Sequence, residues 1–426
     1  MRFKEIIEKQ LLAALEACGF SLGGDRLILE RPRMKEHGDI AAPLALSLAR
    51  VLKRNPLEIA ERIASELSFP QGEIAKIEVA KPGYINLHVA PERLGENLKE
   101  IMAEGDRFGS SEVGAGTKCQ IEYVSANPTG PLVVVSARAA AVGSVLVNLL
   151  RFVGFDVDSE YYVNDHGNQV RALGESLRHR VWERAAKIEP GAEPGAYPGG
   201  YLKTVAEDVS REQMEEWDAK DDAVVEYGRF ATDWLLRSIK DDLDLFGVSF
   251  DRFFRESELH PAGVEEARGI VEEKGFAYVD DGALYFSTTR FGDEKDRVMV
   301  KSDGKPTYFL GDTAYHLDKL RRGYKWVIDL LGPDHHGHIP RMKAAASVLG
   351  ADDEWLSILT VGWIRLLEGG KPVSMSKRAG EIITMRELIE DVGPDVAKYI
   401  FLMRRANAPL DFDLELARTQ SEENPV

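Results

Sequence analysis

The chain has 426 residues, which allows two or three domains of about 150 residues each and a sizeable buried core. Apolar residues make up 44% and charged residues 29%, the mix of an ordinary globular protein. The formal net charge of −17 excludes a chain that holds nucleic acid by its overall charge, so any contact with RNA must use local basic patches.

Cysteine content and the N-terminal segment indicate the compartment. Cys18 and Cys119 are too few for a disulfide scaffold or a cysteine-ligated zinc site. The N-terminal segment intersperses Lys and Glu among its apolar residues and lacks the apolar core of a signal peptide. We identify no apolar run of the ~18–20 residues that cross a bilayer, so we expect a cytoplasmic protein without membrane contact.

Residues 1–107 are typical of a small α+β domain. Apolar residues recur at helical spacing in three segments, 3–15, 41–50 and 56–67. Asn55 is placed to cap the third helix, and Pro56 occupies its first position. Alternating patterns predict two strands, 76–80 and 84–89, joined by a Pro82–Gly83 turn.

Residues 108–370 are typical of an α/β domain. A strand over 119–125, a long apolar helix over 132–153 and a strand over 156–163 form a βαβ unit, which opens a Rossmann-like, doubly wound parallel sheet. The further elements that we predict are helical insertions over 169–187 and 204–245, a hairpin over 282–288 and 296–301 facing 307–310, a strand over 325–331 and a helix over 339–349. Residues 371–426 are expected to form a loop followed by a largely helical segment over 385–417.

Two loop segments carry patterns that point to chemistry. The first, Glu122–Leu132 (EYVSANPTGPL), follows a predicted strand and leads into the long helix. Backbone amides at that helix start would face the carboxyl end of the sheet, where open α/β folds bind ligands. The segment is equally compatible with an ordinary βα turn built from Asn and Pro, and by itself it does not decide between the two.

The second segment, Lys371–Glu381 (KPVSMSKRAGE), is more specific. Its small residues permit movement, and the adjacent cations Lys377 and Arg378 are placed to close over a polyphosphate. Most Lys–Arg pairs lie instead in solvated turns, and it is the order of residues in this segment that favours phosphate binding.

Together these segments resemble the signatures of class I aminoacyl-tRNA synthetases, and the surrounding sequence resembles the arginyl-tRNA synthetase family. The further stretches that carry the resemblance are Tyr161–Gln169, Phe250–Leu259, Gly282–His316 and Gly332–Ala345. Two N-terminal stretches, EHGDIAAPLALSLA and KPGYINLHV, are similar to the family's N-terminal domain, which contacts the elbow of tRNA. The resemblance covers essentially the whole chain.

The resemblance implies an enzyme that condenses arginine with ATP to arginyl-adenylate and then passes the arginyl group to the terminal ribose of tRNA. The expected partners are arginine, ATP with magnesium, and tRNA held at its acceptor end and elbow. A monomer without a permanently bound cofactor is expected. No side-chain nucleophile is needed, because catalysis is positioning plus stabilisation of charge on the α-phosphate and the leaving pyrophosphate.

The resemblance also implies an arginine pocket. Glu122 and Asn127 stand at the positions that hold the substrate's α-amino and carboxylate groups, and Glu256, Tyr308 and Asp312 match the residues that grip the guanidinium. A planar, permanently charged fork is best bound by carboxylates that accept paired N–H donors.

Three histidines follow the strand predicted at 325–331. His335, His336 and His338 are compatible with a metal site, but their spacing also matches the family's loop beside the substrate. We expect His335 to line the arginine pocket, and we expect no bound metal.

The first signature departs from the family pattern H-x-G-H. The four positions are Val133, Val134, Val135 and Ser136, so both imidazoles that donate to the ATP phosphates are missing. Val135 also replaces the glycine that lets adenine lie against the backbone. Each lost donor to a transition state costs ~3 kcal/mol, so adenylation is expected to be severely reduced, with Ser136 retaining one donor.

The second signature is half kept, with Ser374 in place of its first Lys and Lys377 retained. The residues expected on the ATP side are Val133, Val135, Ser136, Met375, Ser376, Lys377 and Arg378. Those expected to act in catalysis are Lys377 and Ser136. The family's helical anticodon-binding domain begins after the segment that SEENPV resembles and is not in the sequence, so no anticodon reading is expected.

Two hypotheses from different classes remain open. The chain is the catalytic region of an impaired arginine–tRNA ligase, with transfer to another acceptor as a variant of that hypothesis. Alternatively, it is an inactive relative that binds arginine or tRNA as a sensor or interaction module. The complete arginine pocket favours the first hypothesis, and the altered first signature favours the second.

Overall fold

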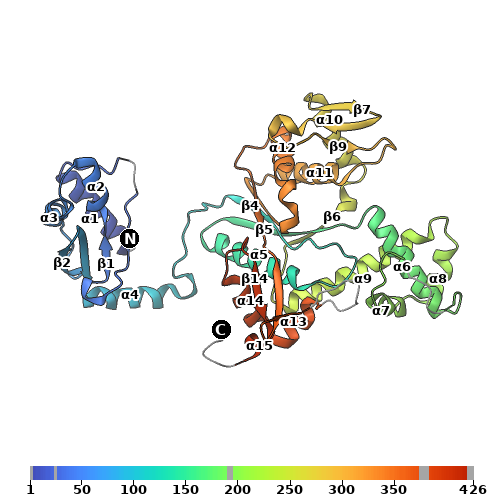
Figure 1. Ribbon diagram of the computed structural model, residues 1–426, viewed down its shortest axis with the longest axis horizontal. Coiled ribbons are helices and arrows are strands. Elements are labelled where there is room, and N and C mark those ends of the chain that lie inside the picture. The colour runs from blue at the N-terminus through green and yellow to red at the C-terminus, as the bar shows by residue number, and fades with distance from the viewer. Residues whose placement is uncertain (1–2, 24–25, 190–194, 374–382, 420–426) are drawn as a thin grey trace. The chain divides into compact units, whose positions relative to one another are not determined.

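The computed structural model describes residues 3–23, 26–189, 195–373 and 383–419, and the chain forms two compact units, Met1–Gly109 and Ser110–Val426 (Figure 1). In the first unit, helices pack against a three-stranded antiparallel sheet of order β1–β3–β2. Its elements are α1 (Phe3–Ala17), η1 (Lys35–His37), β1 (Ile40–Ala42), α2 (Leu44–Leu52), α3 (Pro56–Glu66), β2 (Ile74–Ala80), β3 (Tyr84–Val89), α4 (Pro91–Glu104) and η2 (Gly105–Arg107).

The start of α2 corrects one expectation. The helix predicted from residue 41 begins at Leu44, because Ile40–Ala42 pair with β3 as an edge strand and Pro43, which has no N–H to donate, ends that pairing. The cap of α3 is confirmed, since Asn55 Oδ1 accepts a hydrogen bond from Leu57 N at 2.9 Å.

The second unit is built on a five-stranded parallel sheet of order β11–β10–β4–β5–β6. These strands are β4 (Lys118–Glu122), β5 (Asp156–Val163), β6 (Arg252–Arg255), β10 (Trp326–Leu331) and β11 (Leu356–Thr360). The chain runs outward from β4 through β5 to β6 and then returns to the other side of β4 through β10 and β11. This is the doubly wound, Rossmann-like order that the βαβ pattern predicts, and its topological switch point lies between β4 and β10.

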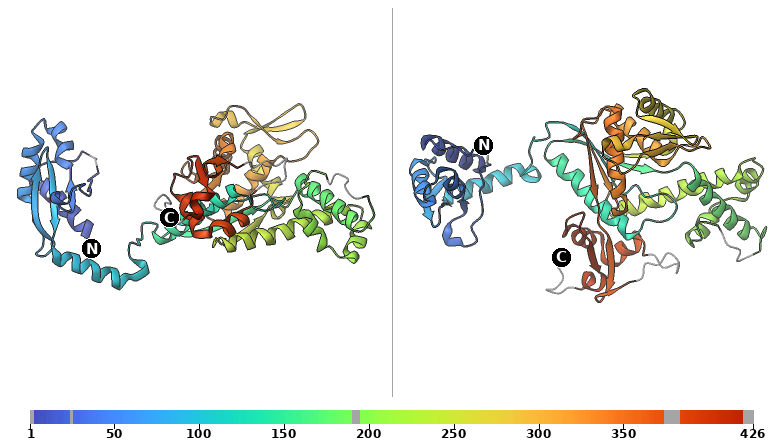
Figure 2. Two further views of the ribbon diagram at one scale, coloured as in Figure 1. Left: turned by 60° about the horizontal axis from the view of Figure 1, so that its bottom comes forward. Right: turned by 45° about the horizontal axis from the view of Figure 1, so that its top comes forward.

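Helices cover both faces of this sheet (Figure 2). One apolar core is shared with α5 (Val134–Phe152), α9 (Ala223–Leu245), α13 (Met385–Val392) and α14 (Pro394–Leu402). The other is shared with α10 (Ala262–Glu273), α11 (Tyr308–Arg321) and α12 (Ile339–Leu349). The helical insertion has a core of its own and consists of α6 (Asn168–Arg184), α7 (Tyr201–Glu207), α8 (Arg211–Asp218) and the start of α9.

Two small sheets and several short helices complete the second unit. The first sheet, of order β7–β8–β9, contains β7 (Ala277–Asp280), β8 (Ala283–Phe286) and β9 (Arg297–Val300). The second, of order β13–β12–β14, contains β12 (Ile364–Glu368), β13 (Lys371–Pro372) and β14 (Leu410–Asp413). The short helices are η3 (Glu256–Leu259), η4 (Thr288–Phe291), η5 (Pro333–His338) and α15 (Leu414–Arg418).

One local expectation about this unit is wrong. Segment 307–310 does not continue as an extended chain facing the hairpin, because Thr307 closes onto β9 through its amide and hydroxyl and Tyr308 begins α11. The final segment is largely helical, as predicted, but it also contains a strand. Residues Leu410–Asp413 pair in parallel with β12, a contact between distant segments that local periodicity does not reveal.

One helix meets the length and composition of a membrane span, which corrects the expectation that none would. Helix α5 has 19 residues and a mean hydropathy of 1.4. Its Arg138 is fully buried and donates to the backbone carbonyls of Gly362, Arg405 and Ala408 at 2.8–3.1 Å. In this fold α5 is therefore a core helix, packed against β4, β5 and α14.

Candidate active site

The predicted arginine-pocket residues gather at the carboxyl ends of β4, β5 and β6, beside the switch point. Glu122 is the last residue of β4 and lies in register with Asp329 of β10 on one side and Glu160 of β5 on the other. Glu256 directly follows β6, and Asp312 lies in the second turn of α11. In open α/β sheets, this is the edge at which ligands bind.

The first feature of the site is a buried group that we call the lysine cluster: Glu122, Lys319, Asp329 and His316. The Lys319 ammonium is fully buried and donates to Glu122 Oε2 at 2.7 Å and to Asp329 Oδ1 at 2.8 Å. His316 Nε2 lies 2.9 Å from Asp329 Oδ2. One ammonium thus holds two carboxylates that strand pairing has brought side by side.

Charge balance controls the protonation of this cluster. Burial acts to lower the pKa of Lys319, but Asp329 and Glu122 raise it overall, so the ammonium stays charged. Burial acts to raise the pKa of Asp329, but Lys319 and His316 hold it far below its usual range. Burial raises the pKa of Glu122, and Lys319 opposes that rise.

The second feature is a group that we call the carboxylate pocket: Glu256, Asp312, Tyr162 and Asn164. With its amide oriented to satisfy its neighbours, Asn164 donates to Glu256 Oε2 at 3.1 Å. His338 Nε2 lies 2.7 Å from Asp312 Oδ2. Burial and the charges of Glu256, Asp312 and Glu122 all raise the pKa of Tyr162, so its hydroxyl lies among the three acids.

This pocket carries uncompensated negative charge. Burial, followed by the charge of Asp312, raises the pKa of Glu256 to about 7. Within the described residues, neither Glu256 nor Asp312 forms an ion pair with a lysine or arginine, and their basic neighbours are His260 at 3.6 Å and His338. A cationic ligand that donates hydrogen bonds to both carboxylates would supply the missing positive charge.

Comparisons with known proteins show which family the chain resembles. Residues 4–89 match the arginyl tRNA synthetase N terminal domain, and residues 97–398 match the catalytic domain of class I (R) tRNA synthetases. The arginine–tRNA ligase of Desulfosudis oleivorans is 43% identical over 401 residues, covering 93% of this chain and 72% of that protein. The arginine–tRNA ligase of Geobacillus kaustophilus is 42% identical, covering 100% and 77%.

The chain belongs to the arginyl-tRNA synthetase family. The solved structure of Thermus thermophilus arginyl-tRNA synthetase has the same fold, with a TM-score of 0.70 at 18% identity, covering 98% of this chain and 78% of that one. The family resemblance inferred from the signature segments is thereby confirmed.

Two other predicted pocket residues are exposed. Asn127 lies in the loop after β4, and Tyr308, the first residue of α11, is 58% exposed. Of the predicted residues beside the substrate, the side chain of His335 lies outside the described part of the chain. Among the described residues, no group of three or more His, Cys, Asp or Glu side chains is arranged to hold a metal ion.

The residues predicted on the ATP side of the site lie at the start of α5. Val133 precedes the first turn of the helix, and Val135 and Ser136 are half-buried within it. Val133 bridges to Thr384, and Met385 N donates to Leu132 O at 2.8 Å, so the chain leaving the second signature is tied to the first. The predicted residues Met375, Ser376, Lys377 and Arg378 lie outside the described residues.

Sequence reasoning missed four residues of the site: Tyr162, Asn164, His316 and Lys319. The first two lie within the stretch Tyr161–Gln169 that carries the resemblance. The other two follow Asp312 at helical spacing on α11, which places all three on one helix face. That spacing would have revealed them if a helix had been predicted from residue 308.

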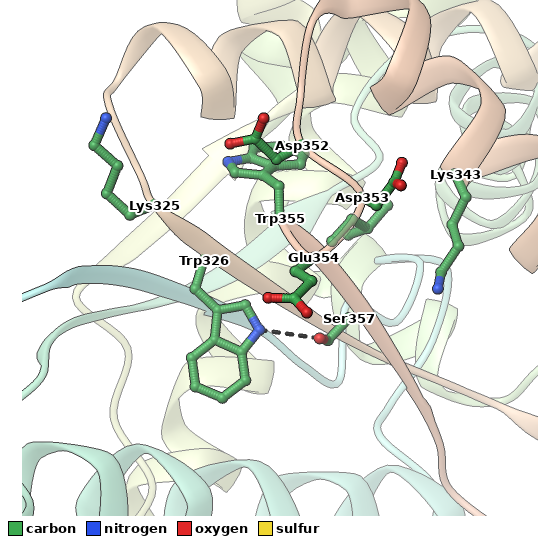
Figure 3. A pocket seen from close by; sticks show the side chains of 9 residues that line it. Lys325, Trp326, Lys343, Asp352, Asp353, Glu354, Trp355 and Ser357 are labelled. Carbon is green, nitrogen blue, oxygen red and sulfur yellow. Dashed lines mark hydrogen bonds between the residues drawn. The ribbon is translucent and has the colours of Figure 1, made fainter. Parts of the chain in front are cut away.

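A separate hollow of about 980 Å³ lies at the opposite end of the sheet (Figure 3). It is lined by the starts of β10 and β11, with Trp326 donating to Ser357 Oγ at 3.0 Å, and by the residues Lys325, Lys343, Asp352, Asp353, Glu354 and Trp355. It lies at the amino ends of the strands, so it takes no part in the site described above.

Proposed function

We propose that this chain is an arginine–tRNA ligase that uses ATP and magnesium to form arginyl-adenylate and transfers the arginyl group to tRNA. The observation that carries the proposal is the carboxylate pocket, where Glu256 and Asp312 lie close together without a lysine or arginine partner among the described residues. A guanidinium is planar, permanently charged and forked, so it fits two carboxylates better than an ammonium does. A shorter or neutral amino acid would leave both acids unpaired.

Adenylation would depend on holding arginine and ATP in the correct relative position. Glu122 ends β4, and the loop after it leads into α5, so an arginine held by Glu122 and Asp312 would present its carboxylate toward the helix start where ATP is expected. The N-terminal end of the α5 dipole favours an anion at this helix start. Lys377 is the proposed cation for the phosphates.

We further propose that adenylation by this chain is slow. Val133 and Ser136 stand where the family has two imidazoles, and Val135 stands where it has glycine. Two missing donors at ~3 kcal/mol each would lower the rate by about ten-thousandfold, before any steric cost at Val135. This observation also favours the second candidate function, an inactive relative that binds arginine or tRNA without activating the amino acid.

Arginine-dependent pyrophosphate exchange, with and without tRNA, separates the two candidates. The unmodified chain should exchange slowly, and the triple variant Val133→His, Val135→Gly and Ser136→His should recover at least a hundredfold of the rate. The two histidines without the glycine should recover far less, because the nucleotide must first approach the backbone. Lys377→Ala in the restored chain should remove the activity again.

The outcomes of this assay are distinct. No exchange in either chain, together with tight arginine binding, would select the binding-only candidate. Exchange by the unmodified chain at the restored rate would show that Ser136, Lys377 and backbone amides suffice, and the proposed impairment would be wrong.

We also propose that tRNA is held at its elbow by the first unit and at its acceptor end by the second. Residues 4–89 match the synthetase N-terminal domain, while the net charge of −17 opposes binding. Binding should therefore be weak and fall steeply with salt. Filter binding with tRNAs altered only in the anticodon tests this, because strong discrimination among them would contradict contacts confined to the elbow and acceptor end.

A further inference from the structure

One face of α11 connects both ends of the proposed arginine site. Asp312, His316 and Lys319 follow one another at helical spacing and point toward the carboxyl ends of β4 and β10. His316 Nδ1 lies 2.8 Å from the Asp312 carbonyl oxygen, and Lys319 lies 4.3 Å from the centre of the Tyr315 ring. The helix thus carries a guanidinium-binding acid at one turn and a fully buried ammonium two turns later.

Lys319 fixes the orientation of the Glu122 carboxylate. Lys319 Nζ donates to Oε2 at 2.7 Å, and Ser125 Oγ donates to Oε1 at 2.9 Å, so both oxygens are held from within the protein. A carboxylate has about four acceptor positions, so two remain for a ligand. The Glu122 side chain is 13% exposed, which leaves an edge open to the site.

The charge of Lys319 is needed because two acids share the space. Glu122 and Asp329 are in register on adjacent parallel strands, and the ammonium lies between them. Without that ammonium, two buried carboxylates would face each other, and one of them would take up a proton. A protonated Glu122 would no longer attract an ammonium group.

We infer that Lys319 is a positioning residue for the amino acid: it keeps Glu122 ionised and aimed at the substrate's α-amino group without touching the substrate itself. The inference rests on the proposed function, because the role of Glu122 toward that group comes from the family resemblance. The inference predicts different effects at the two ends of the site. Neutralising Lys319 should impair recognition of the α-amino group and leave recognition of the guanidinium intact.

Titration calorimetry with two ligands tests this separation. The ligands are L-arginine and δ-guanidinovaleric acid, which is arginine without its α-amino group. In Lys319→Met, affinity for L-arginine should fall at least tenfold, whereas affinity for δ-guanidinovaleric acid should change less than twofold. An equal loss for both ligands would overturn the inference.

A matched control comes from the neighbouring strand. Glu160 is buried, lies in register with Glu122, and pairs with Arg322 at the end of α11 at 2.8 Å. Glu160→Gln therefore breaks a comparable buried pair on the same helix and leaves Lys319 on Glu122. It should keep the preference for L-arginine. If it loses that preference as Lys319→Met does, general damage to α11 explains both, and the inference is overturned.

A measurement on the unmodified chain covers the case in which Lys319→Met does not fold. The ratio of the two affinities should stay constant from pH 8 to pH 6, because Lys319 keeps Glu122 ionised, and titration of Glu256 affects both ligands equally. A ratio that falls tenfold over this range would overturn the inference. Failure of the proposed function looks different, since the unmodified chain would then bind neither ligand.

Discussion

Each of the two charge groups of the site contains one Glu and one Asp, and the two groups reach opposite electrostatic states. In the lysine cluster, an ammonium lies within 2.8 Å of two carboxylates, and the pKa of Asp329 is far below its usual range. In the carboxylate pocket, two acids face each other without such a cation among the described residues, and burial with the charge of Asp312 raises the pKa of Glu256 to about 7.

The difference separates acids whose counter-charge the protein supplies from acids whose counter-charge a ligand would supply. The charge of a buried acid with its own internal cation is neutralised within the protein. Such a pair stabilises the fold only if the pairing offsets the cost of removing both charges from water. A buried acid without such a cation costs stability, and it persists where a ligand supplies the counter-charge. The four predictions that follow test this comparison, in order of decreasing effect.

The largest effect is expected from removing the cation of the lysine cluster. Lys319→Met should lower the free energy of unfolding of the second unit by about 3–5 kcal/mol, because two carboxylates lose their buried partner. Urea denaturation at pH 8 measures this. Lys343→Met, on an exposed position of α12, is the control and should change stability by less than ~0.5 kcal/mol. Equal effects of the two variants would contradict the assignment.

Removing an acid from the carboxylate pocket should instead impair arginine binding. Asp312→Ala should weaken arginine binding at least thirtyfold, since truncating one partner of a desolvated charge pair costs about 2–5 kcal/mol. Affinity for norvaline, which has no guanidinium, should change little. Calorimetry measures both, and Asp352→Ala, in the hollow at the other end of the sheet, serves as the control. A loss of affinity for both ligands alike would argue against guanidinium recognition by Asp312.

Arginine affinity should also depend on pH. Glu256 must be ionised to pair with a guanidinium, and its pKa of about 7 means that it takes up a proton as the pH falls through that value. The groups that face it are Asp312, Tyr162, Asp165 and His260. Binding at pH 6 should be about tenfold weaker than at pH 8, with proton release on binding below pH 7. In Glu256→Gln this dependence should disappear.

The smallest effect is a gain in stability. The folded-state pKa of Glu256 lies above its unfolded value of 4.5, so the chain without arginine loses stability as the pH rises from 4.5 through 7. Glu256→Gln removes that cost and should be more stable than the unmodified chain at pH 8, with the difference vanishing toward pH 4.5. A variant that is less stable at pH 8 would show that Glu256 is compensated after all.

Much of the site was visible in the sequence because chemistry at a strand end is encoded locally. The family resemblance named Glu122 and Asn127, and the βα pattern placed both beside one strand, although the strand predicted over 119–125 ends at Glu122. The altered first signature is equally local, since its four positions lie at one helix start. Lys319 gave no such signal, because a lysine on an amphipathic helix is solvated unless tertiary contacts enclose it.

The sequence by itself determined the family, the βαβ opening of the doubly wound sheet, the acids that the family resemblance assigns to arginine, and the departure at Val133, Val135 and Ser136. These depend on short-range order and on residue identity. Only the tertiary structure decided which acids have an internal cation. Asp329 and Lys319 reach Glu122 across about two hundred residues, because β10 returns beside β4 and α11 packs over both. Charge compensation is a property of distances in space, and the sequence pattern does not contain those distances.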